Sequence, residues 1–112
     1  MSKSRAKGTA WESAIVGYLR AKGYHRAERR ALAGAQDKGD IHLPGLMIEA
    51  KALRDITLAS IMDEVVAQTA HCEPGTLGVA WIKRRNKGID RSYVVMEPDT
   101  FLALVEHRVP KN

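Results

Sequence analysis

The sequence predicts a single α/β domain in which helices flank a central mixed sheet of about five strands. Its 112 residues, 45% of them hydrophobic, are enough for one sizeable core, and no linker divides them. Segments with apolar residues at helical spacing are interspersed with short segments of alternating or continuous apolar character. The expected order is helix, strand, hairpin, helix, strand, strand, helix, which suits either two or three layers.

The chain begins with a polar, basic segment, residues 1–9, which we expect to be a flexible arm able to touch phosphate. Its cations are Lys3, Arg5 and Lys7. A helix is predicted over residues 10–22, because apolar side chains recur there at helical spacing and Gly23 follows. Glu12 falls at the margin of the apolar stripe and could lean toward the sheet. Alternatively, it is an ordinary acid favoured by the dipole of the first helical turn.

A short strand is predicted over residues 24–30, and the Ala- and Gly-rich segment 31–39 indicates a loop. Residues 39–51 then predict a β-hairpin, because apolar and polar residues alternate on both sides of Pro44-Gly45. A two-residue or a four-residue loop gives the same register, whereas a bulged three-residue loop would shift it by one residue. The pairs in the first register are Leu43 with Leu46, Ile41 with Ile48, His42 with Met47, and Asp40 with Glu49.

Asp40 and Glu49 would therefore face each other, and Lys51 follows on the same side of its strand. Like charges across a strand pair repel, so a positive group between them is expected, and a hard Mg²⁺ or Mn²⁺ suits carboxylate oxygens. The alternative is a solvated outer face with surface ion pairs, each worth roughly 0–1 kcal/mol. His42 shares this face and could bind phosphate or transfer a proton, or be a half-exposed strand residue without a function.

A second helix is predicted over residues 57–72, followed by strands over 76–83 and 92–97 and a short final helix from Pro98. Gln68 lies at the border of the apolar stripe of the second helix. It could reach a site on the sheet, or it could be a solvent-facing amide. The final helix is expected to have one apolar side, formed by Phe101, Leu102, Leu104 and Val105.

The charge of the chain favours a polyanionic partner. Eighteen Lys and Arg against thirteen Asp and Glu give a formal net charge of +5. The densest basic cluster joins the last two predicted strands and could clamp a phosphate backbone, or serve only as a solubilising loop. The cations that we expect to contact DNA are Lys3, Arg5, Lys7, Arg29, Arg30, Lys38, Lys83, Arg84, Arg85, Lys87 and Arg91.

Several classes of protein are disfavoured. The four His and the single Cys72 show no zinc-finger spacing, and a lone cysteine predicts no disulfide. The apolar runs are too short to span a bilayer and the N-terminus lacks a secretory signal, so we expect a cytoplasmic protein without membrane contact. Aromatic residues make up only 5% of the chain, which does not support a base-stacking platform.

The order of the acids carries a family resemblance. Glu12 on the first helix, Asp40, and then Glu49-Ala50-Lys51 on the neighbouring strand, followed by an amphipathic helix, resemble the PD-(D/E)xK nuclease superfamily. Within it, the chain is most similar to the small archaeal-type Holliday-junction resolvases and their phage relatives. The resemblance runs from Lys7-Gly8 to Lys51, with Gly39 in place of the Pro of the signature.

The resemblance implies a restriction-endonuclease-like core and hydrolysis of phosphodiester bonds with Mg²⁺, for which Mn²⁺ could substitute. Asp40, Glu49 and the Ala50 carbonyl would hold the ion, and Glu12 would bind a second ion or hold a water. Lys51 would orient the attacking water and stabilise the transition state. Gln68 and His42 are candidate accessory residues.

The resemblance further implies branched DNA as the substrate and a homodimer, because two matched cuts in a junction need a two-fold assembly. The setting would be a prokaryotic or phage-infected cytoplasm, in recombination, repair or phage genome processing. An exonuclease or repair nuclease on linear or damaged duplex is an alternative. A non-catalytic basic DNA-binding module is another, although phosphate binding gains nothing from Asp40 facing Glu49.

Overall fold

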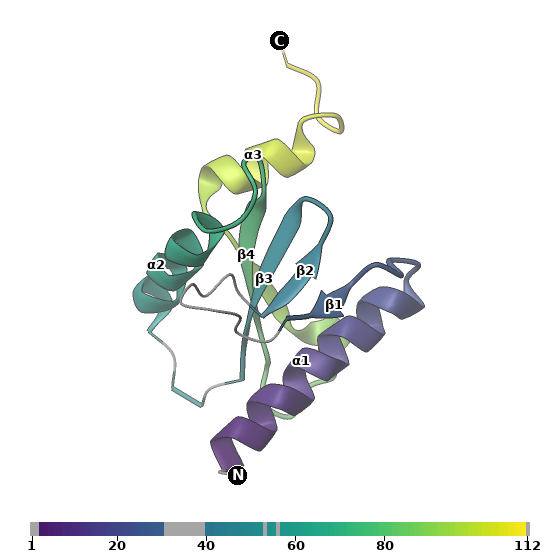
Figure 1. Ribbon diagram of the computed structural model, residues 1–112, viewed down its shortest axis with the longest axis vertical. Helices are drawn as coiled ribbons and strands as arrows, with labels where there is room; N and C mark the ends of the chain where they lie inside the picture. The colour runs from purple at the N-terminus through teal and green to yellow at the C-terminus, as the bar shows by residue number, and fades with distance from the viewer. Residues whose placement is uncertain (1–2, 31–39, 53, 56, 112) are drawn as a thin grey trace.

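The fold is known from a computed structural model that describes residues 3–30, 40–52, 54–55 and 57–111, with the side chains described from Gly8 onward. In the described part of the chain, three α-helices, a short 3-10 helix and five strands follow one another (Figure 1). The helices are α1 (Lys3–Ala21), α2 (Leu58–Thr69) and α3 (Pro98–Val105), with the 3-10 helix η1 at Ile89–Arg91. The strands are β1 (Glu28–Arg29), β2 (Ile41–Leu43), β3 (Leu46–Lys51), β4 (Leu77–Ile82) and β5 (Tyr93–Val95).

The strands form one mixed sheet in the order β1-β2-β3-β4-β5. β3 and β4 are parallel and α2 connects them, whereas the other neighbouring strands are antiparallel. The predicted α/β class, with a mixed five-stranded sheet flanked by helices in a single domain, is confirmed.

The hairpin of β2 and β3 has the predicted two-residue turn. Leu43 pairs with Leu46, and Ile41 pairs with Ile48. Gly45 has a φ of 82°, the conformation that glycine adopts most easily at the third position of a type II turn. The shifted register of a bulged loop is therefore wrong.

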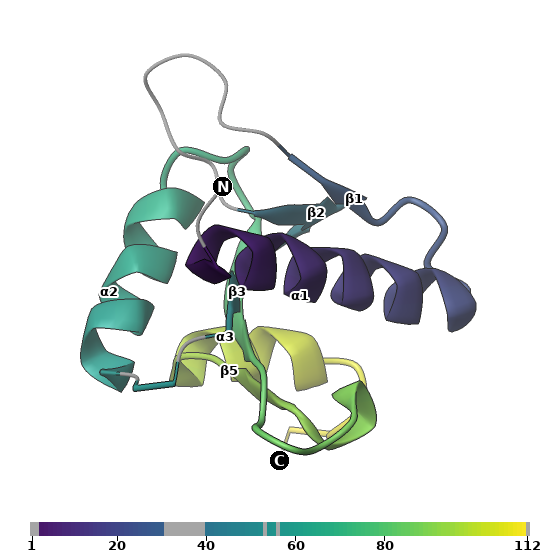
Figure 2. The same cartoon turned by 90° about the horizontal axis from the view of Figure 1, so that it is seen from below.

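Period-2 alternation sends the residues of each strand to two different helices. Ile41 and Ile48 pack with Trp11 and Ile15 of α1 on one face of the sheet. Met47 packs with Ile61 and Val65 of α2 on the other face. Figure 2 shows α1 and α2 on opposite sides of β3, so the arrangement has three layers.

α2 approaches the sheet closely because Gly78 of β4 has no side chain. A Cβ at this position would meet Thr69 Oγ1 and Val65 Cγ1 of α2. The close approach fixes the height of α2 above β3 and β4, and with it the position of every polar side chain that α2 points toward the strands.

The N-terminal helix is longer than predicted. α1 begins at Lys3 rather than at Ala10, so from Lys3 onward the expected flexible arm is wrong for the backbone. The residues of the arm, Lys, Ser, Arg and Ala among them, are good or neutral helix formers that extend a helix already fixed by its buried face. Gly23, with a φ of 101°, ends the helix region as predicted.

The segment before the first strand also differs from its prediction. Only Glu28–Arg29 of residues 24–30 is a strand. The guanidinium of Arg20 donates hydrogen bonds to the Ala27 carbonyl at 2.8 and 3.1 Å, and the Ala27 amide donates to Tyr24. These local bonds hold the chain in turns until it reaches β1.

The second half of the chain follows the predicted order, with one difference in α3. The predicted apolar side of this helix is only partly covered, since no residue of α3 is buried. Phe101, Leu102 and Leu104 are each about half exposed. Among the described helices, none combines the length and the apolar character needed to cross a membrane.

Candidate active site

The site is assembled where four strand ends meet. β2 starts at the same end of the sheet at which β1, β3 and β4 finish, because β1 and β3 run antiparallel to β2 and β4 runs parallel to β3. Two backbone hydrogen bonds extend the ladders there: Arg30 N donates to Asp40 O at 2.8 Å, and Lys83 N donates to Lys51 O at 2.9 Å. We call this the acidic end of the sheet, after Asp40 and Glu49.

Asp40 and Glu49 lie together, as the predicted register requires. Asp40 immediately precedes β2, and its Oδ2 accepts a hydrogen bond from Ala50 N at 3.0 Å. Glu49 is only 3% exposed. Burial, a hydrogen bond with Asp40 and the negative charge of Asp40 raise the pKa of Glu49 to about 9. The neighbouring carboxyl groups therefore favour one proton, or another cation, between them.

The burial of Glu49 decides between the two interpretations of this face. A solvated outer face with surface ion pairs is wrong, because α2 covers the side of β3 from which Glu49 projects. With both carboxyl groups ionised, no donor among the described residues reaches Glu49 Oε2. A buried carboxylate oxygen in this position is costly unless a cation binds it.

Lys51 contacts two carboxylates rather than one. Its Nζ lies 3.6 Å from Glu49 Oε1 and 2.8 Å from Oε2 of Glu64 on α2. Burial lowers the pKa of Lys51, but the hydrogen bond to Glu64 and the nearby carboxylates outweigh burial and raise it. Lys51 therefore carries its positive charge into the site.

Sequence reasoning did not identify Glu64. One signal could have found it: Glu64 lies four residues before Gln68, so the two side chains share one side of α2. Gln68 was already a candidate because of its place at the border of the apolar stripe.

Glu12 reaches the same end of the sheet from α1. Its Oε1 lies 3.3 Å from Nε of Arg29 at the end of β1. Burial and the charge of Asp40 raise the pKa of Glu12, whereas the Arg29 guanidinium lowers it. The predicted inclination of Glu12 toward the sheet is confirmed, and Arg29 is committed to this ion pair.

The donor set fits a hard divalent cation. Among the described residues, no group of three or more Asp, Glu, His or Cys side chains lies close enough to hold a metal ion alone. Mg²⁺, however, usually takes one or two protein carboxylates and completes its octahedron with water and substrate phosphate. Asp40 and Glu49 supply two carboxyl groups, and the uncompensated Oε2 of Glu49 is the atom that most needs a cation.

The two accessory candidates are both buried. His42 is 7% exposed and pairs with Met47, as the register predicted, on the face of the sheet that holds Asp40. It is not the half-exposed strand residue of the alternative interpretation. Gln68 is 5% exposed, so a solvent-facing amide is wrong for it too.

The predicted DNA-contacting cations fall into three groups. Arg29 and Arg30 form ion pairs with Glu12 and Glu28 beside the acidic end. Lys83 and the loop that follows it leave the sheet at the same end, next to Lys51. Lys38 lies outside the described residues, as do the side chains of Lys3, Arg5 and Lys7.

The loop after β4 is held by its own side chains. The Arg84 guanidinium lies 4.8 Å from the ring centroid of Tyr93, and its Nη1 donates to the Arg91 carbonyl at 3.2 Å. Trp81 Nε1 donates to Ser92 Oγ at 2.7 Å at the base of the loop. Arg85 and Lys87 are exposed on this braced segment.

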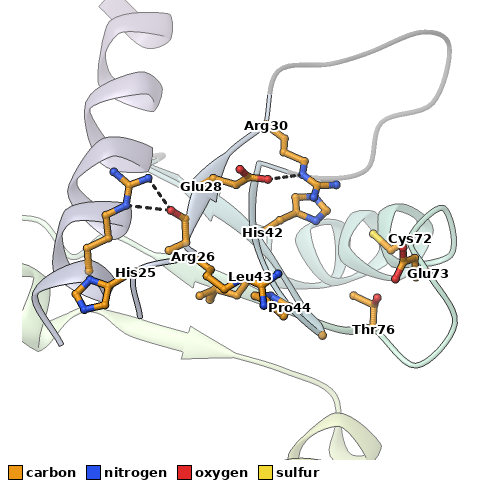
Figure 3. Close-up of a pocket in the computed structure, with 13 residues that line it drawn as sticks. His25, Arg26, Glu28, Arg30, His42, Leu43, Pro44, Cys72, Glu73 and Thr76 are labelled. Carbon is orange, nitrogen blue, oxygen red and sulfur yellow. Dashed lines mark hydrogen bonds and ion pairs between the residues drawn. The ribbon is translucent and has the colours of Figure 1, made fainter. Parts of the chain in front are cut away.

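A separate hollow of about 560 Å³ lies along β2, away from the carboxyl pair (Figure 3). It extends from the Pro44-Gly45 turn past His42 to Arg30. In Figure 3, Arg30 points toward Glu28, with which it forms an ion pair. The Arg20 guanidinium donates to the Ala27 carbonyl before β1. Three arginines, Arg20, Arg26 and Arg30, line the hollow, and the two acids Glu28 and Glu73 offset part of their positive charge. Neither Asp40 nor Glu49 lines it, so the hollow is separate from the carboxyl pair.

Comparison of the chain with protein-family models, with curated proteins and with solved structures found no match.

Proposed function

We propose that the protein is a Mg²⁺-dependent endonuclease that hydrolyses phosphodiester bonds of branched DNA. The observation that carries the proposal is the contact of Asp40 with the buried Glu49, with Lys51 3.6 Å from Glu49 on the same face. Two acids and an ammonium at a sheet end, beside a braced basic loop, suit the cleavage of a negatively charged backbone.

Asp40, Glu49 and the Ala50 carbonyl would hold Mg²⁺, which when bound lowers the pKa of water and offsets charge on the phosphoryl oxygens. Glu49 gives up its proton to become a ligand. Lys51 orients the attacking water and stabilises the negative charge that develops in the transition state. Glu12 either contributes to a second ion or holds the water, and Arg29 keeps the Glu12 carboxylate in place.

Several cations lie at this end of the sheet and support DNA as the substrate. Arg29, Arg30 and Lys83 flank the acids, and Arg85 and Lys87 extend outward on the loop. These cations lie at the same end of the sheet as the carboxylates, where they could contact phosphates on either side of the cleaved bond.

We further propose that the working unit is a homodimer, since two matched cuts need two sites. The half-exposed apolar side chains of α3 supply a surface on which a second copy could pack. A two-fold contact through α3 would use the same patch on both copies.

The test is a cleavage assay on a synthetic four-way junction beside linear, nicked and flap duplexes, with Mg²⁺, Mn²⁺ or a chelator. Paired symmetric nicks in the junction are expected, and only with a divalent ion. Preferential degradation of linear duplex from its ends would instead favour an exonuclease, and metal-independent binding without cleavage would leave a DNA-binding module.

Site variants assign the chemistry. Asp40→Asn, Glu49→Gln and Lys51→Ala should each lower the cleavage rate by at least about a hundredfold while DNA binding persists. The exposed Asp63→Asn and Glu106→Gln make the same changes of charge elsewhere and should leave the rate unchanged. Cleavage by the site variants at the parent rate would refute the proposed active site.

A further inference from the structure

The charged groups at the acidic end form two ion pairs and leave two acids over. Glu12 is paired with Arg29 at 3.3 Å, and Glu64 is paired with Lys51 at 2.8 Å. Each pair is neutral overall. When they ionise, Asp40 and Glu49 are the two carboxyl groups not balanced by a pair of their own, and together they match the charge of one dication.

This balance depends on where Lys51 points. Lys51 and Glu49 project from the same face of β3, two residues apart, so Lys51 is the nearest cation that could bind the Glu49 carboxylate directly. The ammonium group instead lies closer to Glu64, at 2.8 Å, than to Glu49, at 3.6 Å. An ammonium fully seated on Glu49 would have to be displaced before a dication could bind the same oxygens.

The position of Glu64 is set by the packing of α2. Ile61, Val65 and Gln68 are the buried residues of this helix, and Glu64 lies among them in sequence while its side chain stays 43% exposed. Gly78 lets α2 come close to the sheet. The packing of α2 therefore holds the backbone of Glu64 above β3, and its carboxylate contacts Lys51.

We propose that Glu64 is a positioning residue that draws Lys51 away from Glu49, so that the Glu49 carboxylate remains available to the divalent cation. This inference rests on the proposed function, because it concerns the ion of the same site. It assigns to α2 a task that does not require Glu64 to touch the ion or the DNA.

The experiment measures binding of Mn²⁺ to the metal-free protein without DNA, from the electron paramagnetic resonance signal of the free ion. Four proteins form a cycle: the parent, Glu64→Gln, Lys51→Met, and the double variant. Asp63→Asn, the neighbouring exposed acid of α2, is the matched control for the loss of one negative charge. Circular dichroism checks that each variant is folded.

Glu64→Gln should weaken Mn²⁺ binding about tenfold, which corresponds to about 1.4 kcal/mol, because Lys51 then moves onto Glu49. Asp63→Asn should change the affinity less than twofold. In the Lys51→Met background, Glu64→Gln should have almost no effect, since no ammonium is left to compete. In cleavage assays, Glu64→Gln should raise the Mg²⁺ concentration for half-maximal rate and leave the rate at saturating Mg²⁺ close to that of the parent.

Two outcomes would overturn the role of Glu64 alone: equal Mn²⁺ affinity of Glu64→Gln and the parent, or the same loss with and without Lys51. The second result would mean that Glu64 acts on the ion directly. Failure of the parent to bind Mn²⁺ would overturn the metal site together with this inference. Mn²⁺ binding with the expected cycle but without DNA cleavage would overturn the proposed function and uphold the role of Glu64.

Discussion

At the scale of single residues, the fold buries the Glu49 carboxyl group in a place where its ionised form is unfavourable unless a cation binds it. This carboxyl group is buried beside Asp40, and no donor among the described residues satisfies Oε2 when both acids are ionised. Such an arrangement reduces the stability of the metal-free protein at neutral pH. A bound cation would remove this cost, so metal binding and folding should be linked.

The raised pKa of Glu49 predicts a pH-dependent stability. The ordinary pKa of 4.5 applies to the unfolded chain, whereas the folded value is about 9. Between these pH values the folded protein keeps a proton that the unfolded chain has released, so the contribution of Glu49 to stability falls as pH rises. The pKa of Lys51 is raised above 10.5, so Lys51 affects the pH dependence of stability only at a pH above this window.

We expect Glu49→Gln to melt higher than the metal-free parent, by a difference that grows from pH 5 to pH 8. At pH 8 the difference should reach about 4 °C or more, equivalent to a gain of about 1 kcal/mol in a domain of this size. Thermal denaturation followed by circular dichroism measures it, with the exposed Glu73→Gln as control. A difference that stays constant with pH would mean that Glu49 titrates normally.

The residues of the hairpin could be predicted from the sequence because alternation assigns each strand side chain to a face. That pattern alone predicts that Asp40, Glu49 and Lys51 lie on one face of the sheet. It could not reveal the contact of Glu64 with Lys51, because that contact depends on how α2 crosses the sheet; the i, i+4 spacing of Glu64 and Gln68 shows only that they share one side of the helix. Nor could it show that α2 buries Glu49, since a strand with polar residues on one side has the same sequence pattern whether solvent or a helix covers them.

At the scale of elements, the loop between β4 and β5 combines a rigid base with exposed cations. Arg84 is engaged with Tyr93 and the Arg91 carbonyl, and Ser92 Oγ donates to the Ile89 carbonyl at 2.5 Å. These contacts hold the loop in one shape, from which Arg85 and Lys87 project. A fixed basic loop loses less conformational entropy on binding DNA than a flexible one.

Arg85→Ala and Lys87→Ala should each weaken binding to every DNA sequence and lower the slope of log affinity against log salt by about 1. Binding titrations at several salt concentrations measure the slope. Arg108→Ala, which removes an exposed cation beyond α3, should leave it unchanged. If the loop variants kept the parental slope, the loop would not contact phosphate.

Element boundaries were less predictable than element types. The sequence predicted a start of α1 after its true start, because polar residues show no periodic pattern of apolar side chains, although several of them favour a helix. The strand predicted over residues 24–30 proved to be mostly turns, because Arg20 binds the Ala27 carbonyl across the end of α1. A side chain that caps a distant carbonyl leaves no trace in local patterning.

At the scale of the whole molecule, α3 is the α-helix whose apolar side chains the fold leaves most exposed. It is rich in apolar residues, yet none of them is buried. The sequence predicted an apolar side correctly but could not show that the described part of the chain leaves about half of it exposed. For a homodimer, this helix is the natural place of contact.

Phe101→Glu should weaken self-association at least about tenfold, since burying one large apolar side chain is worth about 1.5–3 kcal/mol. Sedimentation velocity over a range of concentrations measures the effect. Tyr24→Glu, which alters an equally exposed aromatic residue next to α1, is the control. The monomeric variant should still nick a junction but lose the pairing of cuts. A parent that is monomeric at all concentrations would refute the dimer.

The tight turn at Pro44-Gly45 limits which insertions and deletions the chain can accept during evolution. Because it sets which side of β2 faces α2, one inserted or deleted amino acid there would turn Asp40 to the α1 layer, while every chemical group remained in the protein. Substitutions among the aliphatic residues of the two strands would be far milder. In natural variants, the aliphatic residues of β2 and β3 should therefore vary in identity far more often than the turn between these strands varies in length.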